Sequence, residues 1–239
     1  MKKLVTICVV AVMILAVSGV QQAGASNITI NINPSQVPDE AQPLVNVGDA
    51  PTGFGPDSWQ NTTKITSTSK VNWHARYIAD GDYLSVLFPT QAATLAINDI
   101  ASISYWTKRP DGTTASQDWA AYIYTRDIDS NPSTWYNHKF INNYNAHTNV
   151  GDWTNYSTDS GMTFGSKTLA NLKISNGTEL VEMISVQTMS NYNTFNGYMD
   201  GLTITLTDGS IGIVNFEAIP EPATMALLGL GGLLLRRRK

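Results

Sequence analysis

The chain has 239 residues, of which 42% are hydrophobic and 14% charged, with 15 Lys and Arg against 19 Asp and Glu. Six of these cations and one acid lie in two terminal segments, so the body between them holds nine cations against 18 acids. So acidic a body argues against nucleic-acid binding, which needs clustered Lys and Arg to neutralise phosphates, and is compatible with neutral sugars or divalent cations. The single cysteine, Cys8, lies in the N-terminal segment, which excludes zinc–thiolate sites and cysteine nucleophiles from the body.

The N-terminal segment has the three parts of an export signal. Lys2 and Lys3 supply positive charge, residues 4–17 form an almost unbroken apolar stretch, and Ala23 and Ala25 make a small-residue cleavage site. The sequence therefore predicts a signal peptide over residues 1–25, removed after Ala25 by the export machinery, rather than an uncleaved membrane anchor.

Alternation of apolar and polar residues recurs through the body, residues 26–219, and predicts strands. Residues 26–70 are partly irregular, because prolines recur between positions 34 and 56, and we expect only short strands there. The predicted strands are Ile28–Ile32, Val71–Tyr77, Tyr83–Phe88, Ala101–Lys108, Ala120–Arg126, Tyr136–Ile141 and Val181–Met189.

A hairpin is predicted near the end of the body. Leu202, Ile204 and Leu206 alternate with threonines, Asp208-Gly209 is the signature of a two-residue type I′ turn, and an apolar strand returns over residues 211–216. A helical turn is predicted over residues 166–172, with Ser166 as its N-cap.

Eight or nine short strands in one body predict an all-β fold: a two-layer antiparallel β-sandwich, jelly-roll-like, flanked by the signal peptide and a short C-terminal hydrophobic helix. A parallel β-helix is the alternative, but the sequence has no fixed-period repeat to favour it.

The sequence contains no recognised catalytic constellation. Glycosidases need two carboxylates in one cleft, whereas Glu179 and Glu182 are three residues apart and would point to opposite faces of a strand. Neither a Gly-x-Ser-x-Gly elbow nor a His-Glu-x-x-His motif is present. We therefore expect a body that is not an enzyme and needs no cofactor, with a hydrolase of unfamiliar active site as the alternative.

Calcium is the one metal that the sequence suggests. Asp127, Asp129 and Asn131 offer oxygen ligands at alternate positions, as the start of an EF-hand loop does, and we expect a structural role for any ion there. The motif is incomplete because Pro132 stands where the EF-hand requires glycine.

Residues 131–156 are rich in aromatic and amide side chains and carry very little charge. Stacking rings flanked by amides suit the apolar faces and hydroxyl rims of sugars, although tryptophan and tyrosine also fill sandwich cores. The predicted carbohydrate-binding residues are Trp135, Tyr136, Asn143, Tyr144, Trp153 and Tyr156.

The C-terminal tail, residues 220–239, has three parts in order. Pro220, Glu221 and Pro222 are followed by 13 mostly apolar residues and then by Arg236, Arg237, Arg238 and Lys239. As a helix the apolar run is about 20 Å long, short for a bilayer core of about 30 Å, but the basic end is typical of a stop-transfer signal.

These three parts closely resemble the PEP-CTERM sorting signal. The resemblance implies transient membrane anchoring by the tail, processing near Pro220-Glu221-Pro222 by an exosortase, and association with exopolysaccharide or biofilm. We therefore expect an exported cell-envelope or extracellular protein whose body binds exopolysaccharide, with a self-assembling surface protein as a further alternative.

Overall fold

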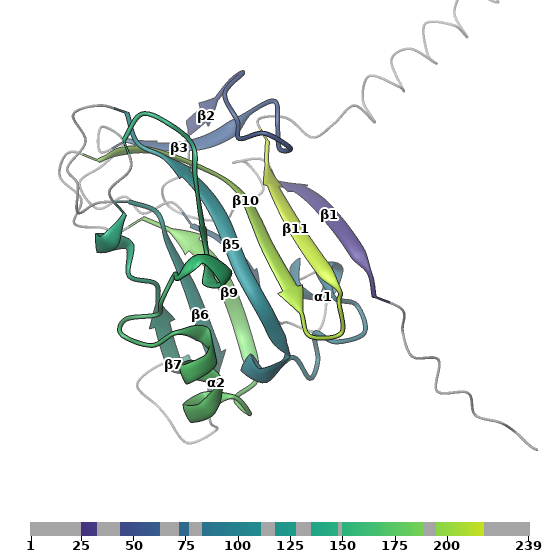
Figure 1. The fold of residues 1–239 in the computed structure, drawn as a ribbon. Coiled ribbons are helices and arrows are strands. Elements are labelled where there is room, and N and C mark those ends of the chain that lie inside the picture. Colours follow the sequence, from purple (N-terminus) through teal and green to yellow (C-terminus); the bar gives the residue numbers. More distant parts are fainter. Residues whose placement is uncertain are drawn as a thin grey trace, which may run out of the picture.

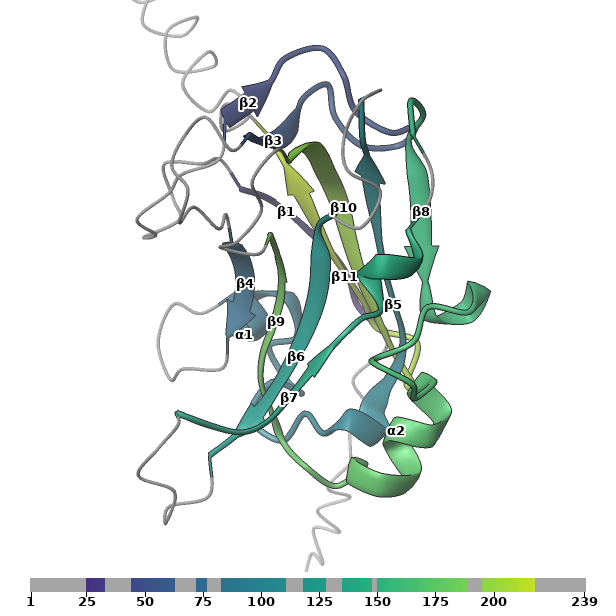
Figure 2. The ribbon, with the colours of Figure 1, turned by 90° about the vertical axis from the view of Figure 1, so that its left-hand side faces the viewer.

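The structure is a computed structural model that describes residues 25–32, 44–62, 72–76, 83–110, 118–127, 135–147, 150–188 and 195–217. Its strands are β1 (Asn27–Ile32), β2 (Leu44–Asn46), β3 (Ser58–Thr62), β4 (Asn72–Arg76), β5 (Ile100–Lys108), β6 (Ala120–Arg126), β7 (Tyr136–Ile141), β8 (Thr154–Ser157), β9 (Val181–Gln187), β10 (Asn196–Leu206) and β11 (Ile211–Phe216). Its α-helices are α1 (Tyr83–Leu87) and α2 (Leu169–Asn176), and the strands form two sheets that pack together (Figures 1 and 2). The predicted all-β fold is confirmed.

The seven-stranded sheet, called the large sheet below, is organised around β10. Along one side β10 pairs with β5, which in turn pairs with the edge strand β8. Along the other side β3 and then β2 lie beside the first half of β10, while β11 and then β1 lie beside its second half. The large sheet is therefore five strands wide beside the first half of β10, in the order β8-β5-β10-β3-β2, and four strands wide beside its second half, in the order β5-β10-β11-β1.

The four-stranded sheet, called the small sheet below, has the order β4-β9-β6-β7 with antiparallel neighbours. The inner faces of the two sheets enclose one hydrophobic core, to which β5, β6, β9 and β10 contribute alternate residues. Fully buried members from these strands include Ile103, Ile123, Ile184 and Ile204. Each such side chain contributes about 1.5–3 kcal/mol by leaving water, so this core is the main source of stability.

Two expectations about strand pairing and secondary structure are wrong. The sandwich is not purely antiparallel, because β1 pairs in parallel with β11, and its jelly-roll connectivity stays a prediction. Residues 83–87 form helix α1 and not a strand: Leu84, Leu87 and Phe88 are buried while Val86 is 46% exposed, which is a helical period. The alternation that predicted a strand was too short to separate the two periods.

The β10–β11 hairpin exists, but its turn differs from the prediction. Leu206 and Ser210 close a three-residue loop, with hydrogen bonds from Leu206 N to Ser210 O and from Gly209 N to Leu206 O. A type I′ turn needs positive φ at both central residues, whereas in the described residues only glycines have it, here Gly209 at 87°. Asp208 instead accepts a hydrogen bond from the backbone of Ser210 at 2.8 Å.

The helical turn predicted near residue 166 begins later. Helix α2 starts at Leu169, and its N-cap is Thr168, whose hydroxyl accepts from the backbone of Asn171 at 3.2 Å. The N-cap prediction at Ser166 is therefore wrong, because a threonine two residues further on meets the first free N–H groups of the helix.

A buried carboxyl fills the point where β3 gives way to β11 along the edge of β10. Asp200 Oδ1 accepts from the backbone N–H groups of Phe216 and Gly201, at 2.8 and 2.6 Å. Burial, opposed by these hydrogen bonds, raises the pKa of Asp200 to about 8. The Asp200 carboxyl thus accepts from a backbone N–H that strand pairing leaves without a partner, and its burial makes ionisation unfavourable.

Candidate functional site

The six predicted carbohydrate-binding residues lie in three places. Trp135 and Tyr136 lie on the outer face of the small sheet, while Trp153 lies beside the outer face of the large sheet. Tyr156 and Asn143 line a cavity next to the edge strand β8. Tyr144 packs against both the main core and the aromatic cluster of the small sheet, and so lies between these regions.

The outer face of the small sheet carries a packed aromatic cluster made of Tyr122, Tyr124, Trp135 and Tyr136. Tyr124 stacks on Tyr122 and on Trp135, with ring centroids 5.8 and 4.9 Å apart, and Tyr136 meets Tyr124 edge-on at 5.2 Å. Tyr122 and Tyr124 are only 2% and 7% exposed, whereas Trp135 is 52% exposed. The cluster is therefore a second small core whose outermost member is Trp135.

Burial also sets the ionisation of the two inner tyrosines. It raises the pKa of both Tyr122 and Tyr124 above the ordinary tyrosine value. Gln187 of β9 donates to the Tyr124 hydroxyl at 3.2 Å. These contacts keep Tyr122 and Tyr124 un-ionised and well packed at ordinary pH.

The outer face of the large sheet carries a row of side chains that crosses it from β2 to the start of β8. The register places Leu44 opposite Gln60, Gln60 opposite Tyr198, and Tyr198 opposite Lys108. Trp153, just before β8, continues the row: its ring lies 6.4 Å from that of Tyr198. Residues Gln60, Tyr198, Lys108 and Trp153 are partly exposed, and we call these four the aromatic row.

One ion pair braces the aromatic row. Lys108 pairs with Asp49 and lies over the rings of Trp153 and Tyr198, 6.0 and 5.6 Å from their centroids. The Trp153 indole donates to Asp49 at 2.9 Å. Burial opposes ionisation of Asp49, but the hydrogen bonds from Lys108, Trp153 and Asn46 outweigh it and hold its pKa below the ordinary value. The two charges therefore cancel within the row.

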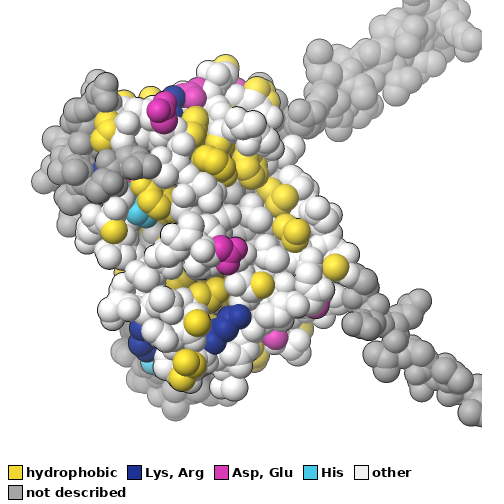
Figure 3. Space-filling model, in the orientation of Figure 1, with side chains coloured by type: hydrophobic (Ala, Val, Ile, Leu, Met, Phe, Trp, Pro, Cys, Tyr) yellow, Lys and Arg dark blue, Asp and Glu magenta, His cyan; other side chains and the backbone are white. Residues whose placement is uncertain are grey.

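The other exposed strand positions of this face are uncharged, although exposed Asp152 and Asp159 flank β8. The partly exposed positions on β5, β8, β10 and β11 that share the face are Ser102, Ser104, Trp106, Asn155, Thr203, Thr205, Ile211, Ile213 and Asn215. Figure 3 shows hydrophobic and uncharged polar side chains over β10, β11 and β1. Within the described strands Asp200 is the one carboxyl at a register position of this face, and it is fully buried.

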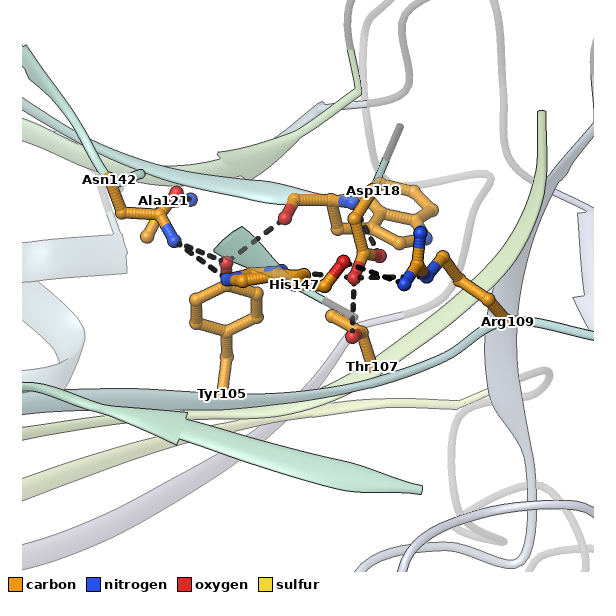
Figure 4. A network of polar contacts seen from close by, with 8 residues as sticks. Tyr105, Thr107, Arg109, Asp118, Ala121, Asn142 and His147 are labelled. Atoms are coloured by element: carbon orange, nitrogen blue, oxygen red, sulfur yellow. Dashed lines mark hydrogen bonds and ion pairs between the residues drawn. The ribbon is translucent and has the colours of Figure 1, made fainter. Parts of the chain in front are cut away.

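A buried polar network joins the two sheets to the connection that follows β7 (Figure 4). Asp118 Oδ2 accepts from Thr107 and faces His147 Nδ1, both at 3.0 Å, while its Oδ1 accepts from the backbone of Trp119 at 2.7 Å. Arg109 lies 3.7 Å from Asp118 and donates to the His147 carbonyl at 2.7 Å. Arg109, Asp118 and His147 are at most 2% exposed, so burial makes each of these contacts costly to lose.

Asn142 completes the network on the other side of the imidazole. Its Nδ2 donates to the Tyr105 hydroxyl at 2.8 Å and lies 3.3 Å from His147 Nε2, and its Oδ1 accepts from Ala121 N at 2.9 Å. The Tyr105 hydroxyl in turn donates to the Trp119 carbonyl at 3.0 Å. Because an amide nitrogen only donates, Nε2 accepts in this arrangement and Nδ1 donates to Asp118. Burial, and then the charge of Asp118, raise the pKa of Tyr105 well above its ordinary value.

A histidine held by a carboxylate is the pair that many general-base catalysts use. Here the second ring nitrogen of His147 is occupied by Asn142, and the ring stacks on Tyr156 with centroids 3.4 Å apart. The geometry therefore fixes the position of the 142–147 turn, with both ring nitrogens of His147 engaged by side chains of the network.

A cavity of about 380 Å³ lies beside this network, between the 142–147 turn, β8 and residues 160–163, which follow β8. Its walls include Asn143, His147, Asn155, Tyr156, Ser160 and Met162. We call it the Tyr156 cavity. Its volume falls in the range of about 300–1,000 Å³ that is typical of small-molecule sites.

Nothing in the described residues builds a metal site. Asp127 has a buried Oδ1 without a hydrogen-bond partner there, but Asp129 and Asn131 lie outside the described residues. No group of three or more His, Cys, Asp or Glu side chains in the described ranges is arranged to hold a metal ion. The calcium site stays a prediction.

The predicted targeting residues also lie outside the described part of the chain, except for Ala25. β1 begins at Asn27, two residues after the predicted cleavage position, and Ser26 already pairs through its carbonyl with the backbone of Ile211 at 2.6 Å. Within the described residues, no helix has both the length and the apolar character needed to cross a membrane.

Comparison with known proteins concerns the tail. A search of curated proteins gives no match to the chain. Residues 218–239 match the family model described as the PEP-CTERM protein-sorting motif, which confirms the resemblance and extends it by two residues. The chain therefore carries a PEP-CTERM sorting motif at residues 218–239, the tail of an exported protein that is sorted by an exosortase.

Proposed function

We propose that this exosortase-sorted protein binds a neutral polysaccharide of the cell envelope or biofilm matrix, and that it does so without catalysis. The binding surface is the outer face of the large sheet, with the aromatic row at its centre. The observation that carries the proposal is the row itself: Trp153 and Tyr198 are partly exposed, held 6.4 Å apart, and flanked by Gln60 and Asn155.

The chemistry of the row suits a sugar chain. A ring that is partly exposed can stack on the apolar C–H face of a pyranose, and amides beside it can bond the hydroxyl rim. The ion pair with Asp49 and the indole hydrogen bond fix the Lys108 and Trp153 side chains before any ligand arrives. Prior ordering of this kind lowers the entropic cost of binding.

Charge favours a neutral glycan over an anionic one. The body holds 18 acids against nine cations, so a polyanion meets long-range repulsion. The aromatic row contributes one cation, which Asp49 already neutralises. A neutral chain avoids the repulsion and gains the stacking contacts.

The described carboxylates support binding without hydrolysis. A glycosidase needs two carboxylates at about 5–10 Å across one cleft. Glu179 bonds His138 and Asn176, Glu182 pairs with Arg126, and Asp118 is buried in the network. None of these three lines the Tyr156 cavity or belongs to the aromatic row, and Asp49, the carboxylate that contacts the row, is paired with Lys108.

Affinity electrophoresis of the purified protein in gels that contain the producer's own polysaccharide tests this function. Trp153→Ala should abolish most of the retardation seen for the wild-type protein. Trp135→Ala is the matched control, since it removes a more exposed tryptophan from the opposite face of the sandwich. Equal retardation of the wild-type protein and Trp153→Ala would contradict the proposal, and self-association without glycan would favour a structural surface protein instead.

A further inference from the structure

We infer that the Tyr156 cavity is a second ligand site, which takes a single uncharged sugar residue such as a chain end or branch. The inference rests on the proposed function in one respect: both sites recognise the same class of neutral glycan. It differs in the unit recognised, because the aromatic row offers an open face and the cavity offers a bounded space of about 380 Å³.

The lining of the cavity is mostly polar, and His147 is its one titratable side chain besides Tyr156. Asn143 and Asn155 bring amides, Ser160 brings a hydroxyl, and Tyr156 brings an aromatic ring, while Met162 supplies an apolar patch. Among the residues that line it there is no Asp, Glu, Lys or Arg. A site of this composition matches a ligand with several hydroxyls and no charge.

Two amides have hydrogen-bonding capacity left for a ligand. The Asn143 side chain makes no hydrogen bond with any residue in the described ranges, and only its backbone is engaged, with Thr163 and Ala146. Asn155 uses Nδ2 for a long contact of 3.5 Å to the Tyr105 carbonyl, which leaves its Oδ1 as an acceptor. An amide presents a donor and an acceptor together, which is what a pair of adjacent sugar hydroxyls requires.

The walls of the cavity are rigid. Tyr156 lies parallel to His147 within 8°, and His147 is held by Asp118 and Asn142. The backbone of the 142–147 turn is tied to Thr163 and to Arg109, so the two sides of the cavity cannot separate without breaking the network. A cavity fixed in advance in this way selects for ligand shape.

Soluble saccharides separate the cavity from the aromatic row. A panel of neutral monosaccharides and disaccharides, with glucuronic acid as the charged counterpart, is titrated into the purified full-length protein and followed by saturation-transfer NMR and calorimetry. We expect at least one neutral sugar to bind in the millimolar range and glucuronic acid to bind at least tenfold more weakly.

Substitutions then locate the site. Ala146→Trp places a large ring on an exposed position of the cavity rim and should abolish the binding of the soluble sugar. Asn143→Ala should weaken it at least fivefold. Asn145→Ala is the matched control, an exposed asparagine of the same turn that does not line the cavity, and should bind as the wild-type protein does. Thermal unfolding checks that the variants remain folded.

The outcomes distinguish the inference from the proposed function. Saccharide binding that survives both Ala146→Trp and Asn143→Ala, or no saccharide binding by the wild-type protein, overturns the cavity site. If Trp153→Ala alone removes soluble-sugar binding, the proposed function stands and the cavity site fails. If the polysaccharide gel shows no retardation but the cavity variants change saccharide binding as expected, the cavity site stands and the proposed function fails.

Discussion

Trp135 and Trp153 come from the same stretch of sequence, which carries little charge, and the fold places them on the outer faces of different sheets. Trp135 caps a cluster in which three tyrosines contact one another, and two of these are almost fully buried. Within the described residues, Trp153 stands next to one ring, that of Tyr198, among amides and a neutralised lysine. The same residue types thus extend a core on one face and remain available to a ligand on the other.

This difference shows that exposure alone does not identify a binding aromatic. Trp135 is 52% exposed, yet its ring stacks on Tyr124 and makes a T-shaped contact with Tyr136. The partners of Trp153 are polar groups that hold the indole by its N–H and by a cation. A ring fixed through polar contacts keeps a face free for stacking, and so we assign polysaccharide binding to the large sheet.

The largest expected difference between the sheets is in pH dependence. Asp200 of the large sheet has a pKa of about 8 in the folded state, against an ordinary value of 3.8. Between about pH 4 and 8 the folded protein therefore keeps a proton that the unfolded chain releases, and the free energy of unfolding falls as pH rises. Asp200→Asn keeps the Oδ1 acceptor but cannot ionise. It should therefore abolish this fall in the free energy of unfolding, which is on the order of 5 kcal/mol over the whole pH range.

Urea denaturation at pH 5 and pH 9 measures this effect. The wild-type protein should lose stability between these values and Asp200→Asn should lose much less. The tyrosine cluster of the small sheet, whose pKa values are raised above 10, contributes its own loss only in more alkaline solution. An equal pH dependence for both proteins would remove Asp200 as the cause.

The network between the sheets supports both outer faces. Asp118→Ala should therefore lower the free energy of unfolding of the whole sandwich. The substitution leaves Arg109 and His147 buried without their shared partner, which costs about 3–5 kcal/mol. Thr107→Val is the matched control, because it deletes one hydrogen bond to the same carboxylate and should cost about 1 kcal/mol. A thermal unfolding midpoint of Asp118→Ala close to that of Thr107→Val would show that the charged residues of the network do not hold the two sheets together.

Tyr198→Ala affects the row without touching the small sheet. Removal of the ring should weaken polysaccharide binding about tenfold, or about 1.4 kcal/mol, since the partner ring of Trp153 remains. Tyr198→Phe keeps the ring and should bind within twofold of the wild-type protein. Affinity electrophoresis at several polysaccharide concentrations gives both values, and equal losses for Ala and Phe would point to the hydroxyl instead of stacking.

Trp135→Ala should produce the smallest effect and affect only stability. Loss of the contacts with Tyr124 and Tyr136 should lower the free energy of unfolding by about 1 kcal/mol, because the ring is half exposed. Its polysaccharide affinity should match that of the wild-type protein. A loss of affinity larger than the loss in stability would transfer the binding surface to the small sheet.

The sequence predicts the strands that alternate over several residues. The bounds predicted for β6 and β7 agree with the structure, although β6 is buried on both faces, in the main core and in the aromatic cluster. The apolar run at residues 83–88 was too short for its period to be recognised, and α1 was missed. The strand β8 was also missed, since its four polar residues carry no apolar alternation.

The candidate sites depend on contacts between distant segments, which no local pattern reveals. Asp118 and His147 are isolated in the sequence, and the network becomes visible only when β5, β6 and the 142–147 turn meet. The aromatic row likewise requires the register of β3, β10 and β5, so Gln60, Lys108 and Asp49 were not predicted as members. The one available signal was compositional: the segment 131–156 combines aromatic and amide residues with little charge.

Hydroxyl-radical footprinting of the purified protein, with and without the producer's polysaccharide, locates the contact surface directly. Oxidation of Trp153 and Tyr198 should fall when the polysaccharide is present, while oxidation of Trp135, measured in the same sample, should stay unchanged. Protection of Trp135 with Trp153 and Tyr198 unprotected would contradict the assignment and place the polysaccharide on the small sheet.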